Sequence, residues 1–427
     1  MDRMNDQEEY ELIRERIKTR PINRKKLFRR TVITAAMAVI FGVLACITFL
    51  VLEPVFSNML TPEEEPVADE VKIPIDEEEI LPEDMILEDE EESPPQIIYQ
   101  EKEKTTTLLE DQIELYEEIY NLSRNCQKSI VTVAGLTQDV DWFNDAYESQ
   151  QVTTGLIVAN NGLELLILTD SSIFKNSENI EVTFFNELTA EAQIKQTDKN
   201  TGLAIIGVPV EKLTSTLLDN SCIAKLGNSK TNRLLGAPVI AVGRPIGTAV
   251  SLEMGMITSK ANVINLIDNN YEMFTTDMNG YDSSNGVIFN MSGEVLGIIW
   301  QKNTALDKST LCAIGISDLK RSIERMSNGK ERAYLGIRGT DVTMEAISHG
   351  VPVGAYVLQI DMDSAAMNAG IQSGDVVTKI DGYEITSFTV FTEAVSMHSP
   401  GDEIALTIKR HSGEEYREME IAVVLTE

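Results

Sequence analysis

The most restrictive feature of this sequence is a stretch of 22 residues, 31–52 (TVITAAMAVIFGVLACITFLVL), that contains no charged side chain. A helix of this length can cross the roughly 30 Å hydrocarbon layer of a bilayer. Nine Lys or Arg residues lie in 14–30, and a basic flank of this kind stays in the cytoplasm. A signal peptide is the alternative, but the apolar core is too long and no small-x-small cleavage site follows before Glu53. The sequence therefore predicts a cytoplasmic basic tail (1–30), a single transmembrane helix and an extracytoplasmic remainder.

The acidic residues are concentrated shortly after this stretch. Residues 62–92 hold sixteen Asp or Glu and a single lysine, and the whole chain has a formal net charge of -32. A segment rich in Glu, Asp and Pro buries too little apolar surface to fold, so 53–104 is predicted to be an unfolded, self-repelling linker. Binding of calcium or of a cationic partner is the alternative for this run. The negative charge argues against a nucleic-acid partner, because phosphate is repelled at long range.

Residues 105–330 show a different pattern, in which short β-rich runs are separated by turn residues. Examples are TTGLIVANNGLELLILTD, APVIAVG and EVLGIIWQ. About ten such runs with almost no helix between them predict a β-barrel or a pair of barrels. Apolar residues at three- and four-residue steps over 108–122 predict a leading helix, which could pack on its own domain or on a copy of itself. A second helix is predicted to close the region, ending at Asn328-Gly329.

Residues 331–427 are predicted to form a separate α+β domain of strands, short helices and a terminal hairpin. Its most informative segment is Tyr334-Leu335-Gly336-Ile337. A glycine turn with open backbone N–H groups can hold the terminal carboxylate of a peptide while the peptide adds a strand to the sheet edge. These four residues are therefore predicted to bind peptides.

The order of an apolar anchor, a double barrel and a small terminal domain resembles the HtrA (high-temperature-requirement A) serine proteases, which end in a PDZ domain. In the terminal domain the resemblance lies in YLGI, GAYVLQIDMDSAAMNAGIQSGDVVTKIDGYEI and PGDEIALTIKR. In the barrels it lies in LGNSKTNRLLGAPVIAVGRPIG, SLEMGMITS and GEVLGIIWQ. The resemblance covers about residues 120–427. It implies a trypsin-like double β-barrel, a PDZ domain and, where the catalytic site is intact, an endopeptidase of envelope protein quality control that commonly assembles as a trimer.

The resemblance fails at the positions that carry catalysis in this family. The family's histidine lies in a motif of the form L-T-N-N-H-V, and the matching LTDSSI has Ser172 in its place. The family's aspartate opens a D-L-A-L-L-K-type strand, and the matching GLAIIG begins with Gly202. The nucleophile motif G-N-S-G-G corresponds to DSSNG, in which Ser284 is the surviving serine and Asp282 replaces the first glycine.

These replacements bear directly on the chemistry. A serine hydroxyl is a weak nucleophile until a base takes its proton and a third group orients that base. Ser172 and Gly202 can do neither, and loss of the base alone slows turnover about a million-fold, equivalent to about 8 kcal/mol. Asp282 would place a carboxylate where negative charge develops in the reaction. No catalytic residue is therefore expected, and Ser172, Gly202 and Ser284 are interpreted as degenerate triad positions.

The sequence offers few other candidates for a base, a metal site or a cofactor site. The three histidines, His349, His398 and His411, all lie in the terminal domain, and Lys260 or Lys302 as a Ser–Lys partner has no favourable spacing. The four cysteines form no metal-binding spacing, and no glycine-rich phosphate loop is present. The sequence predicts no metal, no cofactor and buried thiols at the three cysteines beyond the apolar stretch.

The resulting hypothesis is a membrane-anchored pseudoprotease that serves as a peptide-binding scaffold or sensor. Its PDZ domain would bind C-terminal peptides of envelope or misfolded proteins, and the chain could form a homotrimer. The alternative is an active serine endopeptidase of envelope quality control.

Overall fold

The computed structural model describes residues 24–60, 68–76 and 108–427, except 141–145, 176, 178, 219–221, 248–249, 303–308 and 414. The chain divides into two compact units, Met1–Pro66 and Val67–Glu427. Most of the predicted basic tail and most of the predicted acidic linker lie outside the described residues.

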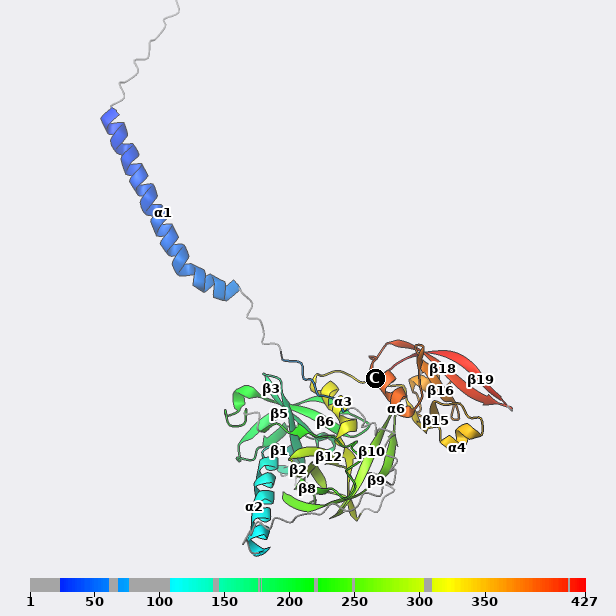
Figure 1. The fold of residues 1–427 in the computed structure, drawn as a ribbon. Coiled ribbons are helices and arrows are strands. Elements are labelled where there is room, and N and C mark those ends of the chain that lie inside the picture. Colours follow the sequence, from blue (N-terminus) through cyan, green and yellow to red (C-terminus); the bar gives the residue numbers. More distant parts are fainter. Residues whose placement is uncertain are drawn as a thin grey trace, which may run out of the picture. The chain divides into compact units, whose positions relative to one another are not determined.

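The first unit contains helix α1 (Arg24–Leu60), drawn in blue in Figure 1. Within it, Phe28–Phe49 is apolar and long enough to cross a membrane, and none of this stretch is buried against other parts of the protein. The predicted helix is confirmed. That it spans a membrane remains a prediction, because only length and composition support it.

The first barrel is a closed ring of six antiparallel strands in the order β1-β2-β3-β6-β5-β4. Its strands are rich in Val, Ile and Leu, and residues 203–208 of β6 are all buried, as expected for a strand enclosed on both faces. The strands are β1 (Ile130–Val140), β2 (Ala146–Asn160), β3 (Glu164–Asp170), β4 (Asn179–Thr183), β5 (Thr189–Asp198) and β6 (Leu203–Pro209).

The second barrel follows the strand order β11-β8-β9-β10-β13-β12-β7, and the additional pairing of β11 with β12 closes the ring. Its largest fully buried side chains are Tyr271 and Phe289. Helix α3 (Ile316–Ser327) follows and packs against strands of both barrels. The strands are β7 (Lys225–Leu226), β8 (Pro238–Arg244), β9 (Ser251–Leu266), β10 (Asn269–Asn279), β11 (Asn285–Asn290), β12 (Glu294–Ile299) and β13 (Thr310–Gly315).

The terminal domain is a sheet in the order β14-β15-β16-β18-β19, with β17 paired to β16 and three short helices. Phe388 and Phe391 of α6 fill its core. Its elements are β14 (Ile337–Asp341), α4 (Met344–Ser348), β15 (Ala355–Ile360), α5 (Ala365–Asn368), β16 (Val376–Ile380), β17 (Tyr383–Glu384), α6 (Phe388–Ser396), β18 (Glu403–Ser412) and β19 (Glu415–Val424). The predicted fold class, mainly β with a double barrel followed by an α+β domain, is confirmed.

The leading helix predicted from the apolar stripe is α2 (Leu108–Gln127). Ile119 and Leu122 pack against the barrel core. Ile113, Tyr116 and Tyr120 of the same stripe are 50%, 69% and 59% exposed. The stripe therefore packs on its own domain only toward the C-terminal end of the helix.

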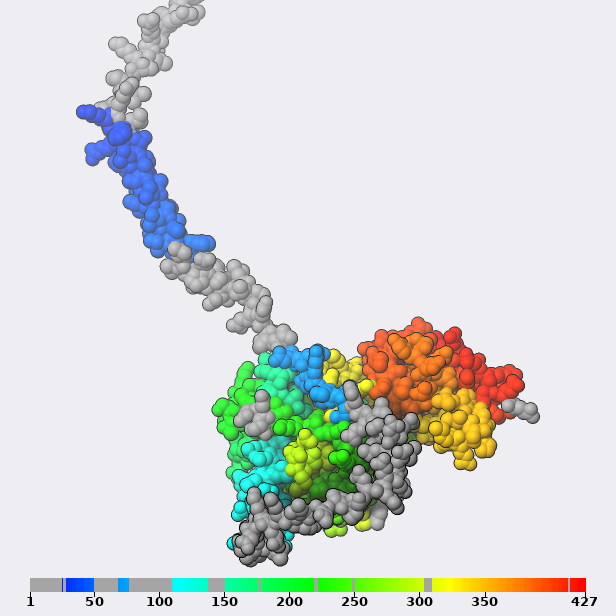
Figure 2. Space-filling model, viewed as in Figure 1, coloured from blue at the N-terminus to red at the C-terminus, as the bar shows by residue number. Residues whose placement is uncertain are grey.

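Residues 68–76, which we call the strap, belong to the second unit and form neither helix nor strand. Val71 is 8% exposed, and its N–H donates to Asn328 Oδ1 at 2.9 Å. Asp76 Oδ1 lies 2.6 Å from the Nζ of Lys320 in α3. Figure 2 shows the strap in blue on the surface beside yellow residues of the α3 region. The expectation of an unfolded linker over 53–104 is wrong for 53–60, which continue helix α1. It is also wrong for the strap, because a buried valine and a buried lysine hold the strap in place.

Candidate functional site

Ser172, predicted from the sequence to stand where the family carries its histidine, lies in the short 3₁₀ helix η1 (Ser171–Phe174) directly after β3. Asp170 caps this helix, and its Oδ1 accepts the N–H of Ser172 at 2.8 Å. The other carboxylate oxygen, Oδ2, lies 2.6 Å from Lys302 Nζ. An Asp170–Lys302 ion pair therefore lies next to Ser172, the first of the predicted degenerate positions.

Gly202 lies immediately before β6 and has a left-handed backbone with φ 72°, which favours glycine. Its carbonyl oxygen accepts both the N–H of Ser171 at 2.8 Å and the hydroxyl of Ser171 at 2.9 Å. A Cβ atom placed on Gly202 would lie 3.0 Å from Lys302 Nζ. Gly202 therefore contacts Ser171, the neighbour of Ser172, and lies close to the Lys302 ammonium that pairs with Asp170.

Ser284 lies in the turn between β10 and β11 and is 6% exposed. Its Oγ accepts the N–H of Tyr281 at 2.9 Å and donates its proton to the carbonyl oxygen of Pro245. The Ser284 N–H donates to the carbonyl of Tyr281 at 2.9 Å. Because a hydroxyl has only one proton, the two hydrogen-bond donors of Ser284, its hydroxyl and its backbone N–H, are both used for bonds within the second barrel.

The space between the barrels beside this turn is small. A cavity of about 30 Å³ is lined by Asp170, Asn285 and Trp300 among others, enough for about one water molecule. Asn285 closes it from one side, because its Oδ1 accepts the N–H of Thr154 at 2.9 Å and the Thr154 hydroxyl at 2.7 Å.

The alternative bases considered from the sequence each contact a group other than Ser284. Lys302 pairs with Asp170, and Lys260 Nζ donates to the carbonyl of Thr231 at 3.2 Å. The histidines make their contacts within the terminal domain, His349 with Glu345, His398 with Asp381 and His411 with Tyr416.

The predicted peptide-binding segment leads into β14. Gly336 has φ 90°, and a Cβ atom there would lie 2.2 Å from the Cβ of Ser364, so only glycine fits this turn. The backbone of Tyr334 pairs with Thr426, and its hydroxyl donates to Asp361 at 2.5 Å. Burial, together with this bond to Asp361, raises the pKa of Tyr334 well above its usual value.

The N–H groups of Leu335, Gly336 and Ile337 all donate to one carboxylate, that of Asp268, over N···O distances of 2.7 to 3.1 Å. Asp268 lies at the tip of the β9–β10 hairpin of the second barrel and is 1% exposed. Burial raises the pKa of its carboxyl, whereas Arg332 and the three N–H groups favour the charged form. Sequence reasoning did not single out Asp268, because LIDNN reads as an ordinary hairpin turn.

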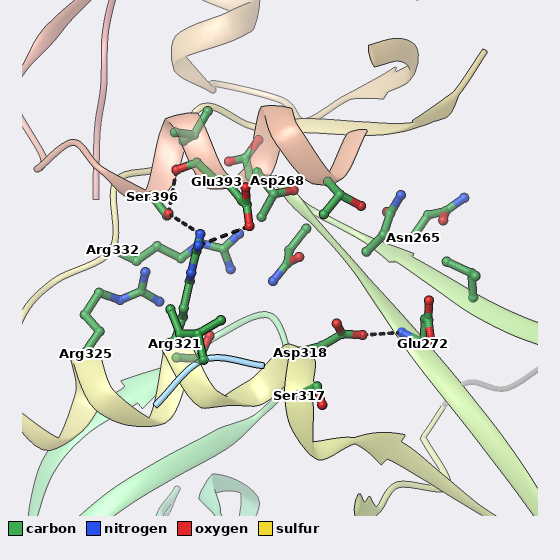
Figure 3. Close-up of a pocket in the computed structure, with 18 of the residues that line it drawn as sticks. Asn265, Asp268, Glu272, Ser317, Asp318, Arg321, Arg325, Arg332, Glu393 and Ser396 are labelled. Atoms are coloured by element: carbon green, nitrogen blue, oxygen red, sulfur yellow. Dashed lines mark hydrogen bonds and ion pairs between the residues drawn. The ribbon is translucent and has the colours of Figure 1, made fainter. Parts of the chain in front are cut away.

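A cavity of about 360 Å³ extends from Asp268 between the barrel and the terminal domain. Thr340 of β14 and Thr392 of α6 line one wall, and Asn270 of β10 lines another. Figure 3 shows Arg321 of α3 reaching across the cavity to α6. There it lies 3.1 Å from the carboxylate of Glu393 and donates to the Ser396 hydroxyl at 3.5 Å.

Within the described part of the chain, no three His, Cys, Asp or Glu side chains are grouped as a metal site would require. Cys126, Cys222 and Cys312 are buried as thiols, as the sequence predicted. Burial raises the pKa of the Cys126 thiol to about 11.

Two family models match this chain. The trypsin-like peptidase domain matches residues 153–298, and the PDZ domain matches residues 333–423. The serine protease Do-like HtrA of Lactobacillus helveticus is 26% identical over 289 residues, covering 63% of this chain and 68% of that protein. A probable periplasmic serine endoprotease DegP-like of Chlamydia trachomatis is 28% identical over 291 residues, covering 64% of this chain and 54% of that protein.

Solved structures show the same fold. The HtrA-type protease AlgW with decapeptide superimposes with a TM-score of 0.52 at 18% identity, covering 72% of this chain and 98% of that chain. The same protease with tripeptide gives a TM-score of 0.51 at 20% identity, covering 72% and 96%. The order of the two matched domains, the double barrel and these relatives identify the chain as an HtrA-like protein, with a trypsin-like peptidase domain followed by a PDZ domain.

Proposed function

We propose that this HtrA-like protein binds peptides without cutting them, as an extracytoplasmic scaffold or sensor anchored by α1. The observation that carries the proposal is the state of Ser284. The Ser284 hydroxyl donates its hydrogen bond to the backbone carbonyl of Pro245. An amide carbonyl is far too weakly basic to take the proton and so to activate the serine as a nucleophile.

The surroundings of Ser284 add further support. Ser172 and Gly202 supply neither a base nor a group to orient one. The Ser284 N–H, which would face an oxyanion, is bonded to Tyr281. Electrostatic stabilisation by such donors is a large part of catalysis in acyl transfer, so its loss removes the remaining route to slow turnover.

Peptide binding is assigned to the PDZ domain. The N–H groups of Leu335, Gly336 and Ile337 converge on one carboxylate, which is the arrangement that a terminal carboxylate requires. The solved AlgW structures carry a decapeptide and a tripeptide, which supports a peptide ligand for this chain also. The proposed partners are C-terminal or unfolded segments of extracytoplasmic proteins, and the exposed part of the α2 stripe is a candidate contact in a homotrimer.

The second candidate function is serine endopeptidase activity, which the names of the relatives favour. A fluorophosphonate probe separates the two candidates, because it reacts with any activated serine regardless of substrate. We expect the full-length chain in detergent micelles to remain unlabelled under conditions that label trypsin completely, and to leave casein intact. Stoichiometric labelling that disappears in Ser284→Ala would refute the pseudoprotease assignment and establish the endopeptidase.

A further inference from the structure

The carboxylate-binding loop of the PDZ domain is already occupied by a group of this chain. The Asp268 carboxylate receives four N–H···O contacts from three consecutive residues, Leu335, Gly336 and Ile337. Hydrogen bonds to a charged acceptor are roughly twice as strong as neutral ones. The loop therefore holds in place the same chemical group that a peptide C-terminus would present.

The backbone of the hairpin tip imitates a bound peptide as well. The N–H of Asp268 donates to the carbonyl of Ile337 at 2.7 Å, as the backbone of an added strand would, and the Ile337 N–H donates in return to the side chain of Asp268. Farther along β14, Asn270 Nδ2 donates to the carbonyl of Gly339 at 3.2 Å. The contact thus follows the edge of β14 away from the loop.

The hairpin tip is held in a particular shape. Asp268 has φ 54°, a left-handed conformation that is uncommon for a residue with a side chain. The carbonyl of the preceding residue, Ile267, accepts bonds from Arg332 Nη2 at 3.0 Å and from Asn200 Nδ2 at 2.6 Å. These two side chains come from opposite sides of the contact, one from the barrel and one from the segment that leads into the PDZ domain.

The rest of the groove is not filled. The cavity of about 360 Å³ is lined by β14 and α6 on the side of the PDZ domain, where the remaining residues of a peptide strand would lie, and by the barrel on the other side. The hairpin therefore competes for the position of the ligand's last residue while leaving room for the residues before it.

We propose that Asp268 is an internal ligand of the PDZ domain, and that a C-terminal peptide binds only by displacing it from the loop. This inference rests on the proposed peptide-binding function. The competing group is tethered in the same chain and has a high effective concentration. The apparent affinity for a peptide is reduced by the fraction of molecules in which the loop is open. Binding of a peptide to the loop therefore requires that the β9–β10 hairpin leaves it at the same time.

The test compares the peptide affinity of the unchanged full-length chain with that of variants at Asp268, all in detergent micelles. Affinity is measured from the fluorescence anisotropy of a fluorescein-labelled decapeptide that ends in a valine with a free carboxylate. Asp268→Gly removes the carboxylate and suits a left-handed backbone. We expect it to bind the peptide at least about tenfold more tightly than the unchanged chain, equivalent to about 1.4 kcal/mol. Asp268→Asn, which keeps one acceptor oxygen, should lie between the two.

The matched control is Asp381→Gly. Asp381 also has a positive φ, 49°, and its Oδ1 accepts a backbone N–H, that of Ala405 at 2.7 Å, but it lies in the turn between β16 and β17. The peptide affinity of Asp381→Gly should equal that of the unchanged chain. Hydrogen exchange of segment 334–338 gives a second readout, because removal of Asp268 should accelerate exchange there while β8 and β18 stay protected.

The outcomes separate this inference from the proposed function. If all chains bind the free peptide equally and lose affinity for its amidated form, the peptide site stands and the internal ligand is refuted. If neither the unchanged chain nor any variant binds the peptide, the proposed peptide-binding function is refuted. The proposed competition between Asp268 and the peptide is then refuted as well. Unchanged hydrogen exchange at 334–338 in Asp268→Gly would also overturn the inference, independently of any ligand.

Discussion

The turn around Ser284 and the loop at 335–337 both present groups that, in an HtrA-like protein, would act on a ligand. In both, those groups are already bonded within the chain. At Ser284 the partners are Tyr281 and Pro245, which belong to the same barrel. At the PDZ loop the partner is Asp268, which belongs to the other domain.

Under the proposed function, this difference separates a lost catalytic site from a covered peptide-binding site. Bonds within one closed barrel break only when the barrel itself is distorted, and no charged ligand competes for the Pro245 carbonyl. Bonds between two domains can be exchanged for bonds to a ligand of the same chemistry, without loss of either core. The sites therefore differ in whether a ligand can replace the internal partner.

The largest expected effect comes from filling the PDZ loop. Gly336→Val places a β-branched side chain at φ 90° and 2.2 Å from the Cβ of Ser364. Strain and overpacking should each cost about 1–3 kcal/mol, and the N–H groups should lose their alignment. We expect peptide binding to fall below detection in the anisotropy measurement while barrel unfolding is unchanged.

Gly350→Val is the control for this variant. Gly350 has φ 91° but no heavy atom within 4 Å of its Cβ position, so it tests backbone strain without the clash. It should retain peptide binding. Undiminished affinity in Gly336→Val would refute the assignment of the carboxylate loop.

The strap provides a third case for this comparison, because its Asp76 carboxylate also contacts a residue far away in the sequence. Here the recipient is Lys320, whose side chain is 4% exposed, and Asp76 also accepts the Ser317 hydroxyl at 2.6 Å. Removing one partner of a buried pair leaves an uncompensated charge. Asp76→Ala should therefore lower the free energy of unfolding by about 3 kcal/mol, measured by urea denaturation with the buried Trp300 as fluorescence reporter.

Glu70→Ala is the matched control within the strap. Glu70 pairs with Lys330, and both side chains are more than half exposed. Its urea midpoint should equal that of the unchanged protein. Equal midpoints for both variants would mean that the strap contributes nothing to stability.

The smallest effect is expected from placing a histidine and an aspartate at positions 172 and 202, the two positions that the sequence predicts to be degenerate. In Ser172→His combined with Gly202→Asp, the new carboxylate would lie beside Lys302 Nζ, and the hydroxyl of Ser284 would still be bonded to Pro245. We expect casein cleavage and fluorophosphonate labelling to stay at background. The control adds Ser284→Ala, and labelling that depends on Ser284 in the double variant would show that its internal bonds are readily exchanged.

Several features could be read from the sequence because they depend on residue identity and local pattern. The period of apolar residues predicted α2, the barrel strands and the PDZ elements. The serine at position 172 and the glycine at position 202 can likewise be read from the sequence, and the prediction that they are degenerate triad positions depends on them. The glycine at 336 is likewise a local requirement, since a turn with positive φ excludes most side chains.

Tertiary structure alone decided which distant groups meet. The sequence places Asp268 in a hairpin turn 67 to 69 residues before the loop that it occupies, and Asp76 in an acidic run that by composition should not fold. Lys302 and Asp170 likewise pair across the chain beside a glycine. Charge and the period of apolar residues indicate which side chains of a segment are buried or exposed, but they do not indicate which other segment those side chains contact. That choice follows from how the barrels and the PDZ domain pack, because packing brings a carboxylate to three open N–H groups.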